Sequence, residues 1–145
     1  DLDDAKLEFA KRFGATHTIN ASREDAVAVI HAMTAREGEY TITRQLVSGA
    51  DYAFDCIGLR QTMEQIAPAC RTCHFGEHVG GTAVLVGVPS TPVELNAIDI
   101  LINEKQFRGS IGGSCAPDRD FPTFLHWRAD DQLPVEVFVT GRDSI

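Results

Sequence analysis

The sequence predicts an α/β fold, a doubly wound parallel sheet with helices on both faces. Short apolar segments alternate along the chain with segments of helical period, which is the pattern of βαβ units. The strongest strand, residues 82–88, is apolar at nearly every position, and this suits a strand that is covered on both faces. The length of 145 residues and the hydrophobic content of 43% fit one globular domain.

The expected elements follow one another without an internal linker or repeat. In chain order they are a helix at 5–13, a strand at 16–19, a helix at 23–33, a loop at 35–48, a strand at 52–57, a helix at 60–70, a strand at 82–88, a helix at 97–103, a strand at 107–111, a helix at 118–129 and a strand at 135–139. The strands are runs bounded by glycine or proline, such as 52–57 before Gly58 and 82–88 before Pro89. The loop at 35–48 is polar at first and then shows no clean period.

Capping residues mark where several helices start. Asp3 or Asp4 can accept hydrogen bonds from the first turn of the first helix. Ser22, with Asp25 three residues later, is similar to a capping box and predicts the start of the second helix. Asp118 can cap the last helix in the same way.

Burial is expected to follow the same pattern. Phe121, Phe124 and Leu125 should form the buried side of the last helix. Cys56 should be a small buried hydrophobic residue on its strand. His31 lies on a helix and is expected at the surface.

Charge and composition exclude several function classes. Lys and Arg number 13 against 21 Asp and Glu, so the formal net charge is −8 and the chain lacks the basic surface that binds nucleic acid or anionic membranes. No apolar run reaches the length of a transmembrane helix. The first residues are acidic rather than leader-like, so the four cysteines predict reduced thiols in a cytoplasmic protein.

Four segments carry a resemblance to a known family. They are DxxxxKLxFAKxFGAT at 1–16, GADYAFDCIG at 49–58, VLVGVP at 84–89 and FRGSIGG at 107–113. In this order and spacing they resemble the dinucleotide-binding domain of zinc-dependent, medium-chain alcohol dehydrogenases. The tail, with DFP at 120–122, LP at 133–134 and FVT at 138–140, is similar to the mycothiol-dependent formaldehyde dehydrogenase and related bacterial alcohol dehydrogenases.

This resemblance implies an incomplete Rossmann-type sheet. Asp1 stands where the family has the acidic residue that ends its second strand. The first strand, the Gly-x-Gly-x-x-Gly turn and the catalytic domain with its zinc ligands would therefore lie upstream, and a final helix and strand would follow Ile145. Residues 1–145 are expected to form a partial dinucleotide-binding domain.

The family's NAD contacts carry over to ten positions. They are Asp1, Lys6, Ile57, Gly58, Thr62, Val86, Gly87, Val88, Ser110 and Gly112. The Asp1 carboxylate would accept hydrogen bonds from both adenosine ribose hydroxyls and repel a 2′-phosphate, which favours NAD over NADP, with Lys6 and Thr62 near this ribose. Glycines at strand ends let a cofactor approach the backbone, and Ser110 and Gly112 would offer backbone groups to the nicotinamide carboxamide. The alternatives are structural: a helix-capping Asp1, a solvated Lys6 and tight packing at the glycines.

One motif stands apart from the family pattern. Cys70, Cys73 and His74 match C-x-x-C-H, which can mark covalent haem, and with His78 they could form a Cys2His2 zinc set. Haem attachment would need an export signal, and the ligand spacing is poor for zinc. An exposed inserted loop with a cysteine at the helix end is the preferred interpretation.

The resemblance implies the NAD-binding portion of an oxidoreductase. In the intact protein, hydride would pass between a primary alcohol or an aldehyde adduct and NAD, with zinc as the Lewis acid, in a homo-oligomer. No catalytic residue or zinc ligand is identified in this chain, and by itself it is expected to be inactive and to bind NAD weakly. Two alternatives stay open: a zinc-free, quinone reductase-like member of the same superfamily, which would commonly use NADP, and a truncated non-catalytic product.

Overall fold

The computed structural model describes residues 1–139 of the chain. Its elements are α1 (Asp4–Lys11), α2 (Ala26–Thr34), β1 (Tyr52–Asp55), α3 (Arg60–Ala69), β2 (Thr82–Leu85), α4 (Ala97–Ile102), β3 (Gln106–Gly109), the 3-10 helix η1 (Ile111–Ser114), α5 (Pro117–Ala129) and the 3-10 helix η2 (Val135–Phe138). The chain divides into two compact units, Asp1–Ser110 and Ile111–Ile145.

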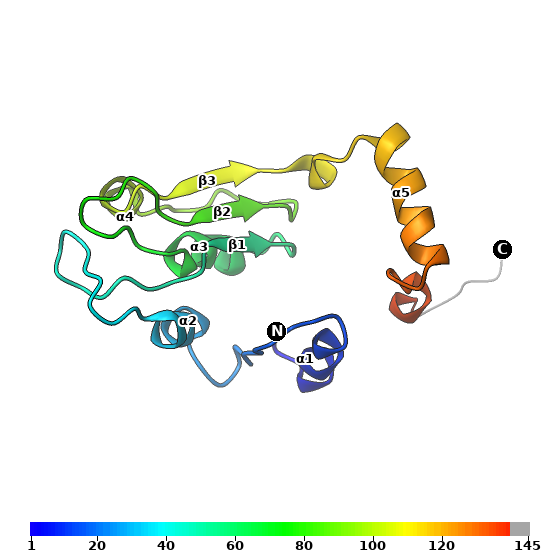
Figure 1. The fold of residues 1–145 in the computed structure, drawn as a ribbon, viewed down its shortest axis with the longest axis horizontal. Coiled ribbons are helices and arrows are strands. Elements are labelled where there is room, and N and C mark those ends of the chain that lie inside the picture. The colour runs from blue at the N-terminus through cyan, green and yellow to red at the C-terminus, as the bar shows by residue number, and fades with distance from the viewer. Residues whose placement is uncertain (140–145) are drawn as a thin grey trace. The chain divides into compact units, whose positions relative to one another are not determined.

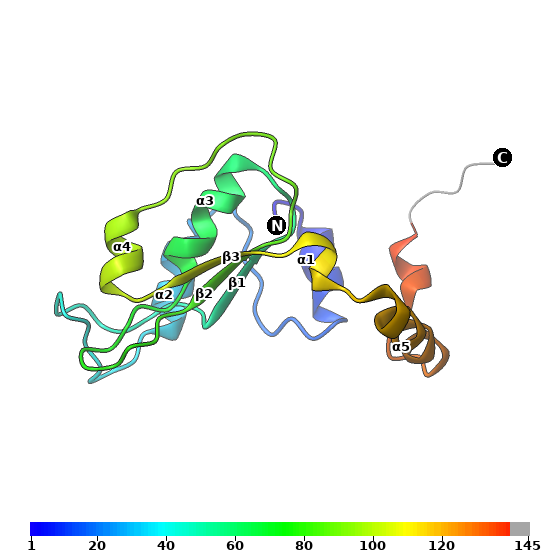
Figure 2. The same cartoon turned by 90° about the horizontal axis from the view of Figure 1, so that it is seen from above.

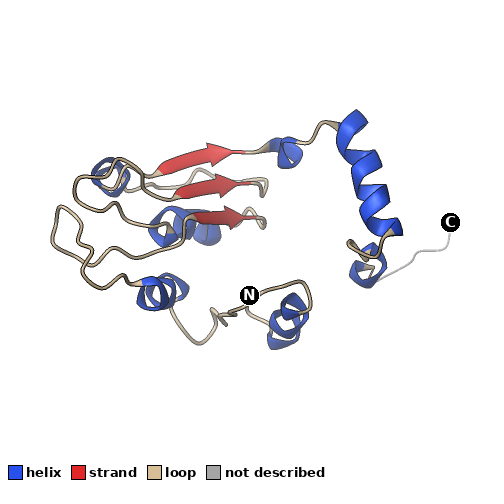
Figure 3. Cartoon of the chain, in the orientation of Figure 1, coloured by secondary structure: helices blue, strands red, loops and turns tan. Residues whose placement is uncertain are grey.

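A three-stranded parallel sheet organises the first unit, in the order β1-β2-β3 (Figure 1). Phe54 pairs with Val84, and Val84 pairs with Arg108. β2 is the central strand, so the expected parallel α/β sheet with the 82–88 segment at its centre is confirmed. Figure 3 shows the three strands side by side, pointing the same way. Their carboxyl ends therefore meet at one edge of the sheet, here called the carboxyl edge, and their starts meet at the opposite amino edge.

The core lies between this sheet and α3. Ile66, Ala67 and Cys70 are buried against Ala83 of β2, and Phe107 of β3 packs against the same cluster. Figure 2 shows α3 and α4 on the same side of the strands. The other face of β1 carries Tyr52 and Phe54, whose rings stack with centroids 6.5 Å apart and which are exposed.

Two helix starts differ from the expected ones. Asp3 caps α1 as expected, by accepting a hydrogen bond from the Ala5 N–H. Asp25, not Ser22, caps α2, because its carboxylate accepts the N–H groups of two first-turn residues, whereas the Ser22 hydroxyl bonds to Asn20. In α5, Asp118 is not the cap.

The first turn of α5 is held by a different carboxylate. The N-cap residue, Ala116, supplies no side-chain cap, and its own N–H donates to Asp120 at 2.7 Å. Arg119 also donates to Asp120, and these bonds lower the pKa of the Asp120 carboxyl from 3.8 to about 2. The position of Asp118 in the sequence predicts it as the cap, but the hydrogen bond from the Ala116 N–H to Asp120, one turn into the helix, holds this helix start.

Two expected strands are absent from the part of the chain that the structure describes. Residues 16–19 form no strand: Asp1 N–H donates to the Ile19 carbonyl and Ala21 N–H to the Asp1 carbonyl, which is one rung of a parallel ladder and no more. In place of the expected strand at 135–139 the structure has η2 (Val135–Phe138), in which the N–H of Val137 bonds to the Pro134 carbonyl. A strand needs a neighbour to pair with: within the described chain, residues 16–19 have only this one rung with Asp1, and residues 135–138 bond within their own turn.

Three burial expectations are also wrong. Cys56 is exposed because it follows the last paired residue of β1 and leaves the sheet. Within their own unit, the apolar side chains of α5, Phe121, Phe124 and Leu125, are exposed. His31 is half-buried, because it bridges two other segments of the first unit.

Candidate functional site

The turns that follow β1 and β2 meet at the carboxyl edge. The Asp55 carbonyl accepts the N–H groups of Val86 and Gly87, each at 2.9 Å. Gly58 has a φ of +84°, and a Cβ added to it would lie 2.4 Å from the Val88 carbonyl oxygen. The first turn is therefore packed directly against the second, and only a glycine fits between them.

The buried side chain of Asp55 holds the same place together. Its Oδ2 accepts the Gly58 N–H at 2.9 Å, and its Oδ1 accepts the Thr62 hydroxyl at 2.6 Å. Gly87 leaves room for this carboxylate, since a Cβ there would lie 2.5 Å from Oδ2. The hydroxyl of Thr62, which is predicted to lie near a ribose, faces Asp55 in this structure. Sequence reasoning missed Asp55, because an acidic residue inside an apolar strand gave no cue to its partners.

Apolar side chains stand out from this edge into solvent. Ile57 is 64% exposed and Val88 is 87% exposed, whereas Gly58 is buried and Val86 and Gly87 are half-buried. Exposed aliphatic groups beside backbone turns at the carboxyl ends of parallel strands are the usual surroundings of a planar ligand in an open α/β sheet. The carboxyl edge therefore offers exposed apolar surface beside two backbone turns.

The turn after β3 adjoins this edge. Ser110 N–H donates to the Leu85 carbonyl at 2.9 Å, which places Ser110 beside the end of β2. Gly112 has a φ of +55° and belongs to the second unit, Ile111–Ile145. The structure thus brings together the predicted residues at 57–58, 86–88 and 110.

Asp1 and Lys6 lie elsewhere in the first unit. Oδ1 of Asp1 accepts the N–H groups of Leu2 and Asp3, and Lys6 is exposed on α1. Asp1 lines a cavity of about 490 Å³, whereas Ile57 and Thr62 line a different one of about 330 Å³ beside β1. The two cavities share Ala26, Ile30 and Ala50 in their walls.

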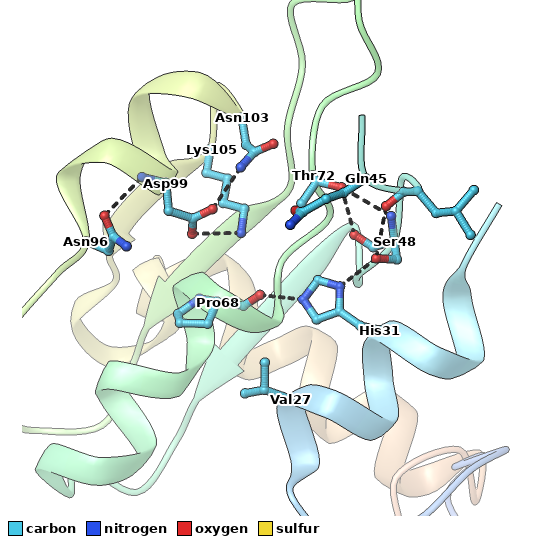
Figure 4. Close-up of a pocket in the computed structure, with 11 residues that line it drawn as sticks. Val27, His31, Gln45, Ser48, Pro68, Thr72, Asn96, Asp99, Asn103 and Lys105 are labelled. Carbon is cyan, nitrogen blue, oxygen red and sulfur yellow. Dashed lines mark hydrogen bonds and ion pairs between the residues drawn. The ribbon is translucent and has the colours of Figure 1, made fainter. Parts of the chain in front are cut away.

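A larger cavity, of about 590 Å³, lies at the amino edge (Figure 4). It is lined by Val27, His31, Gln45, Leu46, Ser48, Pro68, Thr72, Asn96, Asp99, Asn103 and Lys105. Lys105, whose side chain is 2% exposed, donates to Asp99 at 2.9 Å and to the Ala67 carbonyl at 3.0 Å. His31 lies 2.9 Å from the Pro68 carbonyl through Nε2 and 2.7 Å from the Ser48 hydroxyl through Nδ1. The polar groups in this wall are thus largely bonded to one another.

The C-x-x-C-H segment agrees in part with the expected exposed loop, because Cys70 ends α3 as its C-cap residue and residues 75–79 are exposed. Cys70 and Cys73 are buried, and the thiol of Cys73 donates to the Glu77 carbonyl at 3.1 Å. Burial raises the pKa of the Cys70 thiol. His78 pairs with Glu104 at 2.9 Å. Residues 1–139 contain no group of three or more histidine, cysteine or acidic side chains placed to hold a metal ion, so the residues present do not fit zinc.

Comparison with known proteins decides the family. The family model described as zinc-binding dehydrogenase matches residues 1–130. The chain belongs to the zinc-binding dehydrogenase family. No helix within residues 1–139 is long and apolar enough to cross a membrane.

Individual relatives agree with this membership. The chain is 29% identical over 141 residues to an alcohol dehydrogenase class-3 of Cereibacter sphaeroides, a match that covers 97% of this chain and 35% of the relative. It is 28% identical to an S-(hydroxymethyl)glutathione dehydrogenase of Paracoccus denitrificans, covering 100% of this chain and 36% of that one. The structure of an alcohol dehydrogenase zinc-binding domain protein from Burkholderia ambifaria superposes with a TM-score of 0.73 at 27% identity, over 94% of this chain and 32% of that one. The chain thus spans about a third of the length of these relatives.

Proposed function

We propose that the chain is the NAD-binding portion of an alcohol dehydrogenase and that NAD lies along the carboxyl edge. The observation that carries this proposal is the contact between Gly58 and the Val88 carbonyl, which joins two strand-end turns at one ligand-accessible edge. In an open parallel sheet, ligands bind outside the carboxyl ends of the strands. Family membership supports the same cofactor class.

Each residue at this edge has a definite task in the proposal. Ile57 and Val88 flank the flat rings of the cofactor with their exposed aliphatic side chains. The small residues Val86 and Gly87 let the ligand approach the backbone, and the Ser110 carbonyl would accept a hydrogen bond from the carboxamide. NAD, when bound, supplies the hydride acceptor, and these side chains bind and orient it.

Asp1 selects NAD over NADP in this proposal. Oδ1 accepts two backbone N–H groups, whereas Oδ2 makes no hydrogen bond within the described part of the chain and is available to a ribose hydroxyl. A 2′-phosphate at the same place would meet the carboxylate charge. Lys6, exposed on α1, lies in the same segment as Asp1 and contributes to this end of the site.

Strands from elsewhere in the intact enzyme complete the sheet in this proposal. Three observations support unfilled positions next to β1: the rung between Asp1 and the 19–21 segment, the cavity of about 330 Å³ beside β1, and the exposed pair Tyr52 and Phe54. The Gly-rich turn, whose N–H groups would bind the diphosphate, the catalytic zinc and the alcohol or aldehyde site would come from the same remaining part. We place the enzyme in the cytoplasm, with free thiols at all four cysteines as support. The homo-oligomer is the part of this proposal that rests on the family resemblance alone.

Titration of the purified chain with NAD and NADP, followed by NMR, tests this proposal. NAD should shift the amide resonances of Ile57, Gly58, Val88 and Ser110, with a dissociation constant weaker than about 100 μM, because the diphosphate site is incomplete. Asp1→Ala should reduce the preference for NAD over NADP, and Asp3→Ala, which removes only the helix cap, should leave this preference unchanged. Shifts confined to the amino edge, or none anywhere, would count against the proposal, as would unchanged selectivity in Asp1→Ala.

A further inference from the structure

We propose that Asp55 is the positioning residue of the carboxyl edge, holding the turns after β1 and β2 in the relative arrangement that the cofactor meets. The role toward the cofactor rests on the proposed function, whereas the contacts of Asp55 with the two turns do not depend on it. Asp55 is 2% exposed. Its backbone carbonyl bonds to Val86 and Gly87, and its side chain bonds to Gly58 and Thr62. One residue therefore joins both turns and the first turn of α3.

Hydrogen bonds explain how the Asp55 carboxylate can be buried. No Lys or Arg side chain bonds to it within the described part of the chain, and a buried carboxylate without compensation is costly. Compensation comes from two short hydrogen bonds, one from a hydroxyl and one from a backbone N–H. The position near the start of α3 adds to this, because the amino end of a helix favours negative charge and Leu59, the N-cap of α3, supplies no side-chain cap.

Gly58 and Gly87 both lie against the Asp55 carboxylate. A Cβ on Gly87 would lie 2.5 Å from Oδ2 and 2.3 Å from the Gly58 nitrogen, so a larger residue would displace the carboxylate from the N–H that it accepts. Gly58, which donates this N–H, has a positive φ that residues with a side chain rarely adopt. Asp55, Gly58 and Gly87 therefore act as one unit, and Ile57 and Val88 are carried outward by the turns that this unit fixes.

Four variants of the 145-residue chain test the role of Asp55. Asp55→Asn keeps the size of the side chain but replaces one acceptor oxygen with a donor. Thr62→Val keeps the shape and removes the hydroxyl, Thr62→Ser keeps the hydroxyl, and Gln61→Val changes a neighbouring exposed helix position as a matched control. Hydrogen exchange of the Gly58 amide is measured by NMR in each variant, together with the NAD titration.

We expect Gly58 exchange at least about tenfold faster in Asp55→Asn and Thr62→Val, with Thr62→Ser and Gln61→Val close to wild type. The NAD-dependent shifts of Ile57 and Val88 should weaken in the same two variants. Unchanged Gly58 exchange in Asp55→Asn would overturn the inference, and so would equal acceleration of every amide, since that reports a general loss of stability. If the variants alter Gly58 exchange but the wild-type chain shows no NAD-dependent shifts, the proposed function is overturned. The inference that Asp55 positions the two turns is then still supported.

Discussion

The two edges of the sheet differ in what their polar groups do. At the amino edge, around the cavity of Figure 4, Lys105 bonds to Asp99. His31 bonds to the Pro68 carbonyl in the same wall. At the carboxyl edge, one buried carboxylate holds two glycine turns, and Ile57 and Val88 are left exposed. Cavity size alone would select the amino edge as the binding site. The comparison teaches that a polar cavity whose groups already have partners stabilises a fold, whereas exposed apolar groups on a rigid edge are suited to a ligand.

Removal of the Lys105 ammonium should have the largest effect on stability. Lys105→Met leaves the Asp99 carboxylate and the Ala67 carbonyl without their buried partner, and we expect a loss of about 3 kcal/mol in the free energy of unfolding, measured by urea denaturation. Lys11→Met, at an exposed pair with Glu8, is the control and should change stability by less than about 0.5 kcal/mol. A loss below about 1 kcal/mol in Lys105→Met would contradict the conclusion that the polar groups of the amino edge stabilise the fold.

A methyl group at Gly87 should damage the carboxyl edge. Gly87→Ala forces a Cβ against the Gly58 nitrogen and Asp55, and we expect a loss of about 1–3 kcal/mol with altered amide resonances at Ile57 and Val88. Gly109→Ala is the matched control, because a Cβ there meets nothing within 4 Å. If both variants keep wild-type stability and spectra, the contact between the two turns is not rigid.

Loss of the His31 bridge should cost about 1–2 kcal/mol, because two hydrogen bonds across the amino edge are removed together. The measurement is urea denaturation of His31→Ala, with the exposed His126→Ala as control. Combining His31→Ala with Ser48→Ala in a double-mutant cycle should show non-additive losses. Additive losses would mean that the ring and the hydroxyl stabilise the fold separately.

The smallest effect is expected at His78. The hydrogen bond to Glu104 raises the pKa of His78 above its usual 6.5, so the pair contributes to stability fully below about pH 6.5 and loses this contribution as the pH rises through the folded-state pKa. The His78 side chain is 83% exposed, so the gain is small. An NMR titration should show a raised midpoint that returns toward 6.5 in Glu104→Gln. An equal midpoint in both proteins would show that the pair does not form in solution.

Much of the fold could be predicted because local signals and global fold agree. The β1 and β2 segments are largely apolar, and α3 carries a helical apolar stripe that fits them. The positions of Gly58 and Gly87 at strand ends were likewise readable, because glycine after a strand marks a turn. Their assignment to an NAD site remains a prediction.

The sequence by itself determined the order of the elements, the parallel sheet and the family. Only the tertiary structure decided that Asp55 and Lys105 are buried with partners, that His31 bridges two segments, and that residues 16–19 form no strand. The reason is physical: helix period, capping residues and turn glycines act within a few residues of the chain, whereas a strand or a buried charge depends on groups far away in sequence. The Asp55 carboxylate and the Lys105 ammonium look like ordinary charges until the fold supplies the N–H, hydroxyl and carbonyl groups that make their burial possible.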